Sequence, residues 1–148
     1  MKNTFDIPQL FLRIALGVGF ILPVLDRSGW LGAQGIAGNA WGNWENFVSY
    51  THSLMPYMSK PMTEIMACMA TIGETIFGIT LIIGFKTKLA SIGSFLLTLM
   101  FALSMFVFAG YRAPFNYSVF ADSAASLLLA AMPVYKWSTD HYLSKNRS

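Results

Sequence analysis

Three ionisable residues, Arg13, Glu74 and Asp122, lie inside stretches of the sequence that are otherwise long and apolar. A charge at the centre of a bilayer costs roughly 2.5–3.5 kcal/mol even on a lenient scale, so it persists where a partner or a function offsets the cost. A planar guanidinium can hydrogen-bond two carboxylates at once. These residue types therefore indicate either a buried ion-pair cluster that fixes helix register or a site that exchanges protons.

The rise of an α-helix places the three residues at similar depths. Counted along its apolar segment, Arg13 lies roughly 12 Å from the expected cytoplasmic edge, and Glu74 and Asp122 lie roughly 15–18 Å from it. An arginine side chain can span that difference. We therefore predict that Arg13 pairs directly with Glu74 and that Asp122 belongs to the same polar cluster.

One cation and two carboxylates would leave this cluster with a net negative charge. Such a charge is unfavourable in a low-dielectric site, so one carboxylate should stay protonated or a ligand should supply a hydrogen-bond donor. We predict that Glu74 is the ionised partner of Arg13 and that Asp122 is the neutral proton donor. Glu74 and Asp122 are thus the candidate catalytic residues, and Arg13 is a candidate ligand-binding residue.

Small and hydroxyl-bearing residues extend the predicted site. Gly17 follows Arg13 by one helical turn and Gly78 follows Glu74 in the same way, so each charged face carries a residue that permits close approach of a second helix. Hydroxyl groups on the third and fourth apolar segments complete the set of candidate ligand-binding residues: Ser94, Thr98, Ser118 and Ser126.

The composition indicates a membrane protein. Charged residues make up 11% of the 148 residues and hydrophobic residues 55%, whereas a soluble domain carries about 25% charged residues. Four apolar segments have the length of about 20 residues that a membrane-spanning helix needs: residues 5–25, 62–84, 89–109 and 115–134. We predict an all-α, four-helix transmembrane bundle that forms a single domain over residues 1–148. The net charge of +3 is too small to indicate nucleic-acid binding.

Basic residues in the connecting segments predict the orientation. The side that holds both termini carries Lys2, Lys86, Lys88, Lys136, Lys145 and Arg147, and the other side carries Arg27, Lys60 and Arg112. Because basic residues concentrate on the cytoplasmic side, we expect both termini there, in a multi-pass protein of the bacterial inner (cytoplasmic) membrane.

The long connection, residues 26–61, would then lie outside. It is rich in glycine and then aromatic, and its apolar residues recur at spacings of three and four from Trp41 to Met55, with Asn39 as a candidate N-cap. This pattern predicts a short amphipathic helix in the membrane interface. An ordinary connecting helix packed over the mouth of the bundle is the alternative.

No metal site is predicted. The single cysteine, Cys68, excludes an intrachain disulfide and a CxxC pair, and His52 and His141 lie outside the apolar segments, which excludes a bis-histidine haem within the bundle. A methionine repeat between Met55 and Met69 is typical of adaptable packing more than of copper binding. Any electron carrier should therefore be a bound organic molecule or a partner protein.

Three stretches resemble the DoxX family of small four-helix membrane proteins: FLRIALGVGFILPVLDR at 11–27, GETIFGITLIIGFKTKLAS at 73–91 and WSTD at 137–140. The arginine of the family's first helix matches Arg13, and the glutamate of its second helix matches Glu74. The first stretch departs from the family at its end, LPVLDR. WSTD lacks the glycine-rich approach that is usual before the family's terminal motif, so the resemblance assigns that motif no role here.

The resemblance implies a membrane subunit of a redox complex, because the family is named for a subunit of a quinone-reducing sulfur-oxidation complex. Quinone, or a similar small lipid-soluble ligand, would bind at the Arg/Glu/Asp cluster and a partner protein would deliver electrons. If the chain is itself an enzyme, it is a quinone-linked oxidoreductase subunit without its own metal or thiol centre.

Two other functions stay open. One is a non-catalytic scaffold or assembly factor, which would dock a partner through the outer aromatic segment. The other is a small proton-coupled carrier, for which four helices without an internal repeat are few unless the chain forms a homo-oligomer.

Overall fold

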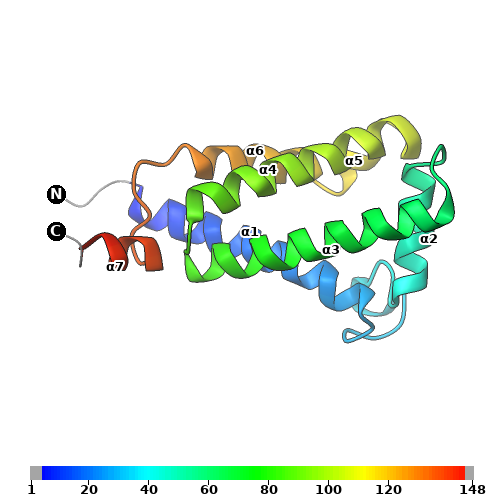
Figure 1. Cartoon of the computed structure of the whole chain (residues 1–148), viewed down its shortest axis with the longest axis horizontal. Helices are drawn as coiled ribbons and strands as arrows, with labels where there is room; N and C mark the ends of the chain where they lie inside the picture. The colour runs from blue at the N-terminus through cyan, green and yellow to red at the C-terminus, as the bar shows by residue number, and fades with distance from the viewer. Residues whose placement is uncertain (1–4, 146–148) are drawn as a thin grey trace.

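The computed structural model describes residues 5–145, and this part of the chain is helical without any β-strand (Figure 1). The helices are α1 (Asp6–Arg27), α2 (Trp44–Leu54), α3 (Lys60–Ile83), α4 (Thr87–Ser104), α5 (Ala113–Asn116), α6 (Val119–Ala130) and α7 (Thr139–Lys145). A 3-10 turn, Ile36–Gly38, precedes α2, and a π-helical turn, Met105–Ala109, extends α4.

Three of these helices are long and apolar enough to cross a membrane: α1, α3 and the combined helix Thr87–Ala109. The segment predicted at 115–134 is instead divided into α5 and α6, because Ser118 between them is left-handed with φ +57° and interrupts the helical ladder. Pro133 follows the end of α6, where a proline disfavours helix continuation. The 12 residues of α6 rise only about 18 Å, which is less than a hydrocarbon core of about 30 Å.

Two glycines face each other where α1 crosses α3. A Cβ atom built on Gly17 would lie 2.9 Å from the carbonyl oxygen of Gly78, and one built on Gly78 would lie 3.1 Å from the carbonyl oxygen of Gly17. These distances leave no room for a side chain at Gly17, so the backbones meet directly. The expected close approach at these two glycines is confirmed.

The apolar core is small and the outer surface is apolar. Leu16, Phe20, Leu81, Ala90 and Leu129 form the buried cluster. Large apolar side chains remain exposed along the outer faces of the long helices, for example Ile65, Ile72, Ile76, Ile79 and Ile83 on α3. Such a surface suits lipid rather than water.

The bundle has two different ends (Figure 1). One, here called the α7 end, holds the start of α1, the α3–α4 turn and α7; the other, the α2 end, holds α2 and the loop that precedes it. At the α7 end, Lys136 Nζ lies 2.8 Å from Asp6 Oδ2, which joins the segment before α7 to the first turn of α1.

The WSTD motif at residues 137–140 binds the α3–α4 turn at the α7 end. The Asp140 carboxylate accepts hydrogen bonds from the backbone N–H groups of Lys86 and Thr87, both at 2.7 Å, and so caps the start of α4. Thr139 Oγ1 donates to the carbonyl of Ile83 at 2.9 Å, and the Asp140 N–H donates to the carbonyl of Gly84 at 3.0 Å. The motif thus satisfies backbone groups that two helix ends leave unpaired.

Replacing Asp140 with alanine should lower the free energy of unfolding by about 1–2 kcal/mol, since it removes a helix cap made of two hydrogen bonds. Asp140→Asn keeps one acceptor oxygen and should lose about half as much. Thermal unfolding of the purified protein in one fixed detergent would measure both. Equal stability of Asp140→Ala and the unmodified chain would show that the motif does not cap α4.

Candidate functional site

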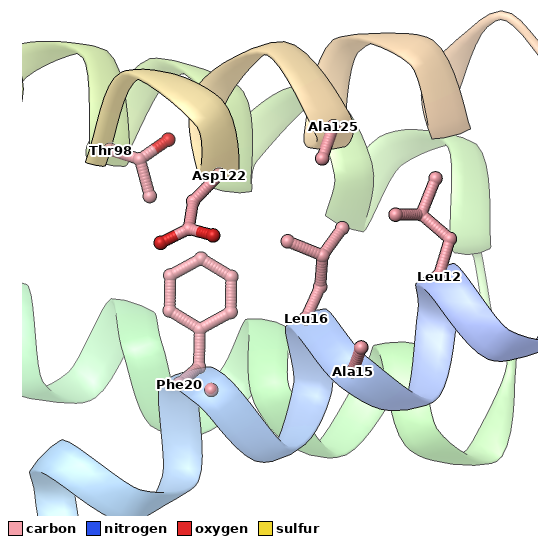
Figure 2. Close-up of a pocket in the computed structure, with 8 residues that line it drawn as sticks. Leu12, Ala15, Leu16, Phe20, Thr98, Asp122 and Ala125 are labelled. Atoms are coloured by element: carbon pink, nitrogen blue, oxygen red, sulfur yellow. The ribbon is translucent and has the colours of Figure 1, made fainter. Parts of the chain in front are cut away.

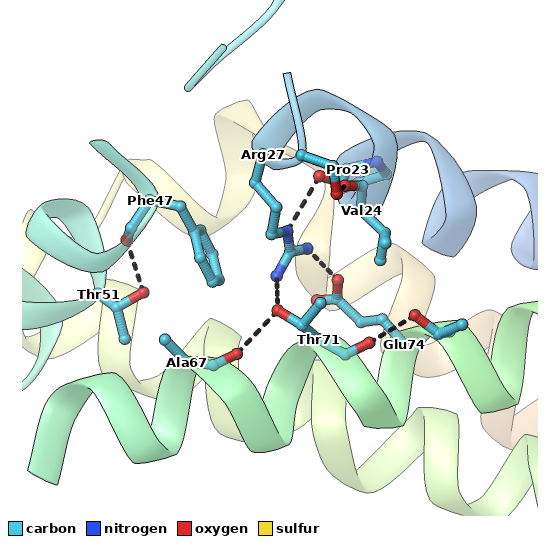
Figure 3. Close-up of polar contacts among 10 residues, drawn as sticks. Pro23, Val24, Arg27, Phe47, Thr51, Ala67, Thr71 and Glu74 are labelled. Carbon is cyan, nitrogen blue, oxygen red and sulfur yellow. Dashed lines mark hydrogen bonds and ion pairs between the residues drawn. The ribbon is translucent and has the colours of Figure 1, made fainter. Parts of the chain in front are cut away.

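Glu74 pairs with Arg27, so the predicted pairing with Arg13 is wrong. Figure 3 shows the Arg27 guanidinium reaching from α1 to α3, where Nη2 donates to Glu74 Oε2 and Nη1 donates to Thr71 Oγ1 at 2.9 Å. The Arg27 Nε atom donates to the carbonyl of Pro23 at 3.0 Å. Arg27 is 1% exposed and Glu74 8%. All three guanidinium nitrogens are thus satisfied, as a buried ion pair requires.

Aromatic residues of the outer segment cover this ion pair. The Phe47 ring centroid lies 3.9 Å from Arg27 Cζ and the Trp41 ring centroid 5.4 Å from it, both within cation–π range. Asp26 holds the segment in place, because its carboxylate accepts the backbone N–H groups of Ala40, Trp41 and Gly42 at 2.8–3.1 Å. The outer segment is thus fixed over the Arg27–Glu74 ion pair.

The helix of the outer segment starts later than predicted. Asn43, not Asn39, is its N-cap, because Asn43 Oδ1 accepts the backbone N–H of Asn46 at 2.9 Å. The Asn39 side chain instead donates to the carbonyl of Leu31 at 2.8 Å, within the preceding loop. Phe47 and Leu54 are buried on the inner face of α2, which packs across the mouth of the bundle.

Arg13 lies at the α7 end. Its Nη2 atom donates to the carbonyl of Trp137 at 3.0 Å, and its Nη1 atom would lie 2.8 Å from a Cβ built on Gly84. The side chain is 1% exposed, and its Nε and Nη1 atoms have no partner within residues 5–145. Helical side chains lean towards the N-terminus of their helix, which carries this guanidinium away from Glu74.

Asp122 stands apart from both arginines, so the predicted three-residue cluster does not form. Figure 2 shows its carboxylate pointing from α6 towards the Phe20 ring of α1. The carboxylate has no hydrogen bond or ion pair within the part of the chain that the structure describes. It lines a cleft of about 170 Å³ between α1, α4 and α6, together with Leu12, Ala15, Leu16, Gly19, Phe20, Thr98 and Ala125.

Comparison with known proteins supports the membrane assignment. The family model for DoxX matches residues 9–110, from α1 to the end of the π-helical turn. The chain belongs to the DoxX family. Neither the curated proteins nor the solved structures gave a match. With its three long apolar helices, this DoxX protein is a multi-pass membrane protein that contacts the lipid bilayer.

The hydroxyl-bearing residues of the predicted site in the DoxX chain separate into three groups. Thr98 lies in the cleft with Asp122 and donates to the carbonyl of Ser94 at 2.8 Å. Ser94 and Ser126 are fully buried, and their hydroxyl groups have no partner among the described residues. Ser118 is exposed, and it is not one of the residues that line the cleft.

A second hollow lies between α3, α4 and α2. It has a volume of about 440 Å³ and is almost wholly apolar. Met55, Met66 and Met69 of the methionine repeat line it, as does Met100 of α4. This placement agrees with adaptable packing, the role that the sequence favoured for these residues.

Proposed function

We propose that this DoxX-family chain is the membrane subunit of a redox complex and binds a quinone, or a similar small lipid-soluble ligand, in the cleft at Asp122. The observation that carries this proposal is an unpartnered carboxylate on the wall of a cleft within an apolar bundle. Ionisable groups at such positions are costly and are kept for function. The Arg27–Glu74 pair is complete without a ligand, so Glu74 has a structural role in this proposal.

The residues around the cleft would have different roles in binding and reducing the ligand. Leu16 and Phe20 would pack against the ligand ring, and protonated Asp122 would donate a hydrogen bond to a ring oxygen. Reduction of a quinone to a hydroquinone takes up two electrons and two protons. Asp122 would give one proton to the ring oxygen and be reprotonated before giving the next, while the electrons come from a partner protein.

Gly19 would supply the route from the lipid. It is exposed, and a Cβ built on it meets no atom within 4 Å. The wall of the cleft is therefore open at this point, so a hydrophobic ligand could enter sideways from the bilayer. A larger side chain at Gly19 would occupy the opening without striking the backbone.

Gly19→Leu should therefore lower the amount of quinone that co-purifies with the protein by roughly tenfold, since the filled cleft no longer admits a ring. The matched control is Gly73→Leu, which fills the hollow between α3 and α4 instead. Solvent extraction and mass spectrometry of both purified variants would give the ratio of quinone to protein. Retention that falls in the control but not in Gly19→Leu would move the binding site to the other hollow.

For the topology we propose four crossings with both termini in the cytoplasm of a bacterial cell. The start of α1 and α7 lie at the same end, which requires an even number of crossings, and α5 with α6 would form the fourth. Lys86, Lys88 and Lys136 lie at this end, as the positive-inside rule expects. Labelling of Ser148→Cys and Asn46→Cys in Cys68→Ala cells would test it, and reaction of Ser148→Cys from outside would reverse the orientation.

A scaffold function has one supporting observation. The α2 end exposes aromatic side chains that the bundle does not use, and Trp30 is 81% exposed. Exposed aromatic residues are typical anchors of protein interfaces. If this surface docks a partner protein, Trp30→Ala should abolish its co-purification and leave quinone retention unchanged. Loss of retention in Trp30→Ala would argue against a separate docking surface.

A further inference from the structure

Buried polar atoms without a partner gather in one half of the bundle. Within residues 5–145 they are Gln9 Oε1, Arg13 Nε and Nη1, Thr87 Oγ1, Ser94 Oγ and Ser126 Oγ. All of them lie between the α7 end and the level of Asp122. Native structures leave few such groups unsatisfied, and water fills most of the exceptions. This half of the bundle therefore has buried polar groups that internal water would satisfy.

Three of these atoms are hydroxyl groups on α4 and α6. Other buried hydroxyls in the long helices bond to the carbonyl of the preceding turn, as Ser91 does to Thr87 and Thr98 does to Ser94, both at 2.8 Å. Thr87, Ser94 and Ser126 make no such bond, although each is fully buried. Their hydroxyl protons are therefore free for a water molecule.

The packing of α4 against α6 brings the Ser94 and Ser126 hydroxyls to similar levels. The two helices lie side by side in opposite directions (Figure 1), and Ser123 Oγ donates to the carbonyl of Phe95 at 3.4 Å. From this contact, the helical rise places Ser126 about 4.5 Å nearer the α7 end, close to the level of Ser94. Asp122 lies about 6 Å farther from the α7 end than Ser126 does. A single water bridging two hydrogen bonds of about 2.8 Å spans the step from Ser126 to Asp122. Thr87 precedes Ser94 by about 10.5 Å along α4, so that step takes more than one water.

We propose that Thr87, Ser94 and Ser126, with water between them, form a proton path from the α7 end to Asp122. The path rests on the proposed function, in which Asp122 loses protons to a ligand and must regain them. Each hydroxyl would accept one proton and release another, so that the net transfer is one proton from bulk water to an Asp122 oxygen.

The opposite end offers no such route. There Arg27 and Glu74 bond to each other, and Phe47 covers them. Cations near the proposed path include Lys86 and Lys88, which are exposed and flank Thr87, and the buried Arg13, whose positive charge would oppose an excess proton. However, the Arg13 guanidinium contacts Trp137 and Gly84 beside the α3–α4 turn, where Asp140 interacts with it electrostatically. The Asp140 carboxylate therefore offsets part of the positive charge that the proton would meet.

Exchange of the Asp122 carboxyl proton for deuterium tests the path. The full-length protein in lipid would be transferred to D₂O and the infrared band of its protonated carboxyl followed with time. In the double variant Ser94→Ala/Ser126→Ala the exchange should slow roughly tenfold, because two hydrogen-bonding relays are lost. Alanine favours helix, so the variant should fold; circular dichroism would check this, and either single variant can replace it. Thr75→Val on α3 is the matched control.

Each outcome decides the proposal. Slower exchange in the double variant, with no change in Thr75→Val, supports the path. An Asp122 band whose exchange is the same in the double variant overturns the path and leaves the proposed function standing. Equal slowing in Thr75→Val also overturns it, because the effect is then not confined to α4 and α6. The absence of any band that Asp122→Asn removes overturns both proposals.

Discussion

Replacing either member of the Arg27–Glu74 pair with leucine is expected to lower the free energy of unfolding by about 3–5 kcal/mol, because the remaining partner becomes an uncompensated buried charge. Arg27→Leu would leave Glu74 without an ion-pair partner in the bundle. Glu74→Leu would leave the Arg27 guanidinium with Thr71 and Pro23 as its polar partners. The double variant removes both charges and should be more stable than the sum of the two single losses predicts. The difference measures the pairing itself.

Arg13 supplies the matched control for this experiment. It is as buried as Arg27 but bonds to Trp137, so Arg13→Leu and Glu74→Leu should be additive within about 0.5 kcal/mol. Chemical unfolding of the five variants in mixed micelles would give both coupling energies. Coupling of Glu74 to Arg13, with none to Arg27, would restore the pairing that the sequence predicted and contradict the structure.

The sequence located the intramembrane charges but assigned the wrong arginine. Counting helical rise gives the depth of a Cα atom, whereas a long side chain ends about a turn away from it. Arg13 leans towards the α7 end, and Arg27 leans back into the bundle and reaches Glu74. Arg27 also lies beyond the expected end of the first helix, which the apolar pattern placed at Leu25. The adjacent charges of Asp26 and Arg27 at a helix end were the available signal.

The apolar pattern predicted the helices better than their interruptions. It identified the three long spans, but it joined α5 to α6 because both are apolar. Ser118 breaks that run through its backbone conformation, which hydrophobic periodicity does not report. The role of Asp140 was missed for a related reason: its partners, Lys86 and Thr87, are distant in sequence, and a cap of that kind is visible only once the chain has folded.

Asp122 is the part of the predicted site that the structure leaves available for chemistry, and its replacement should have the largest effect on activity. Asparagine has nearly the same shape and still donates a hydrogen bond, but it cannot release a proton. Asp122→Asn should therefore fold and retain quinone, while reduction of the bound quinone by an added chemical reductant slows roughly 100-fold or more, as expected for loss of a general acid. Asp122→Leu should also lose roughly tenfold in retention, because the hydrogen bond itself is gone.

Infrared spectroscopy identifies the carboxyl group directly, and quinone extraction with rapid-mixing kinetics gives retention and rate for the same samples. The protonated carboxyl band should disappear in Asp122→Asn and persist in Glu74→Gln, since we expect Glu74 to be ionised in its pair with Arg27. A band that survives in Asp122→Asn but vanishes in Glu74→Gln would make Glu74 the proton donor. Unchanged reduction rates in Asp122→Asn would show that the proton reaches the ligand by another route, because asparagine at this position can hold the ligand but cannot protonate it.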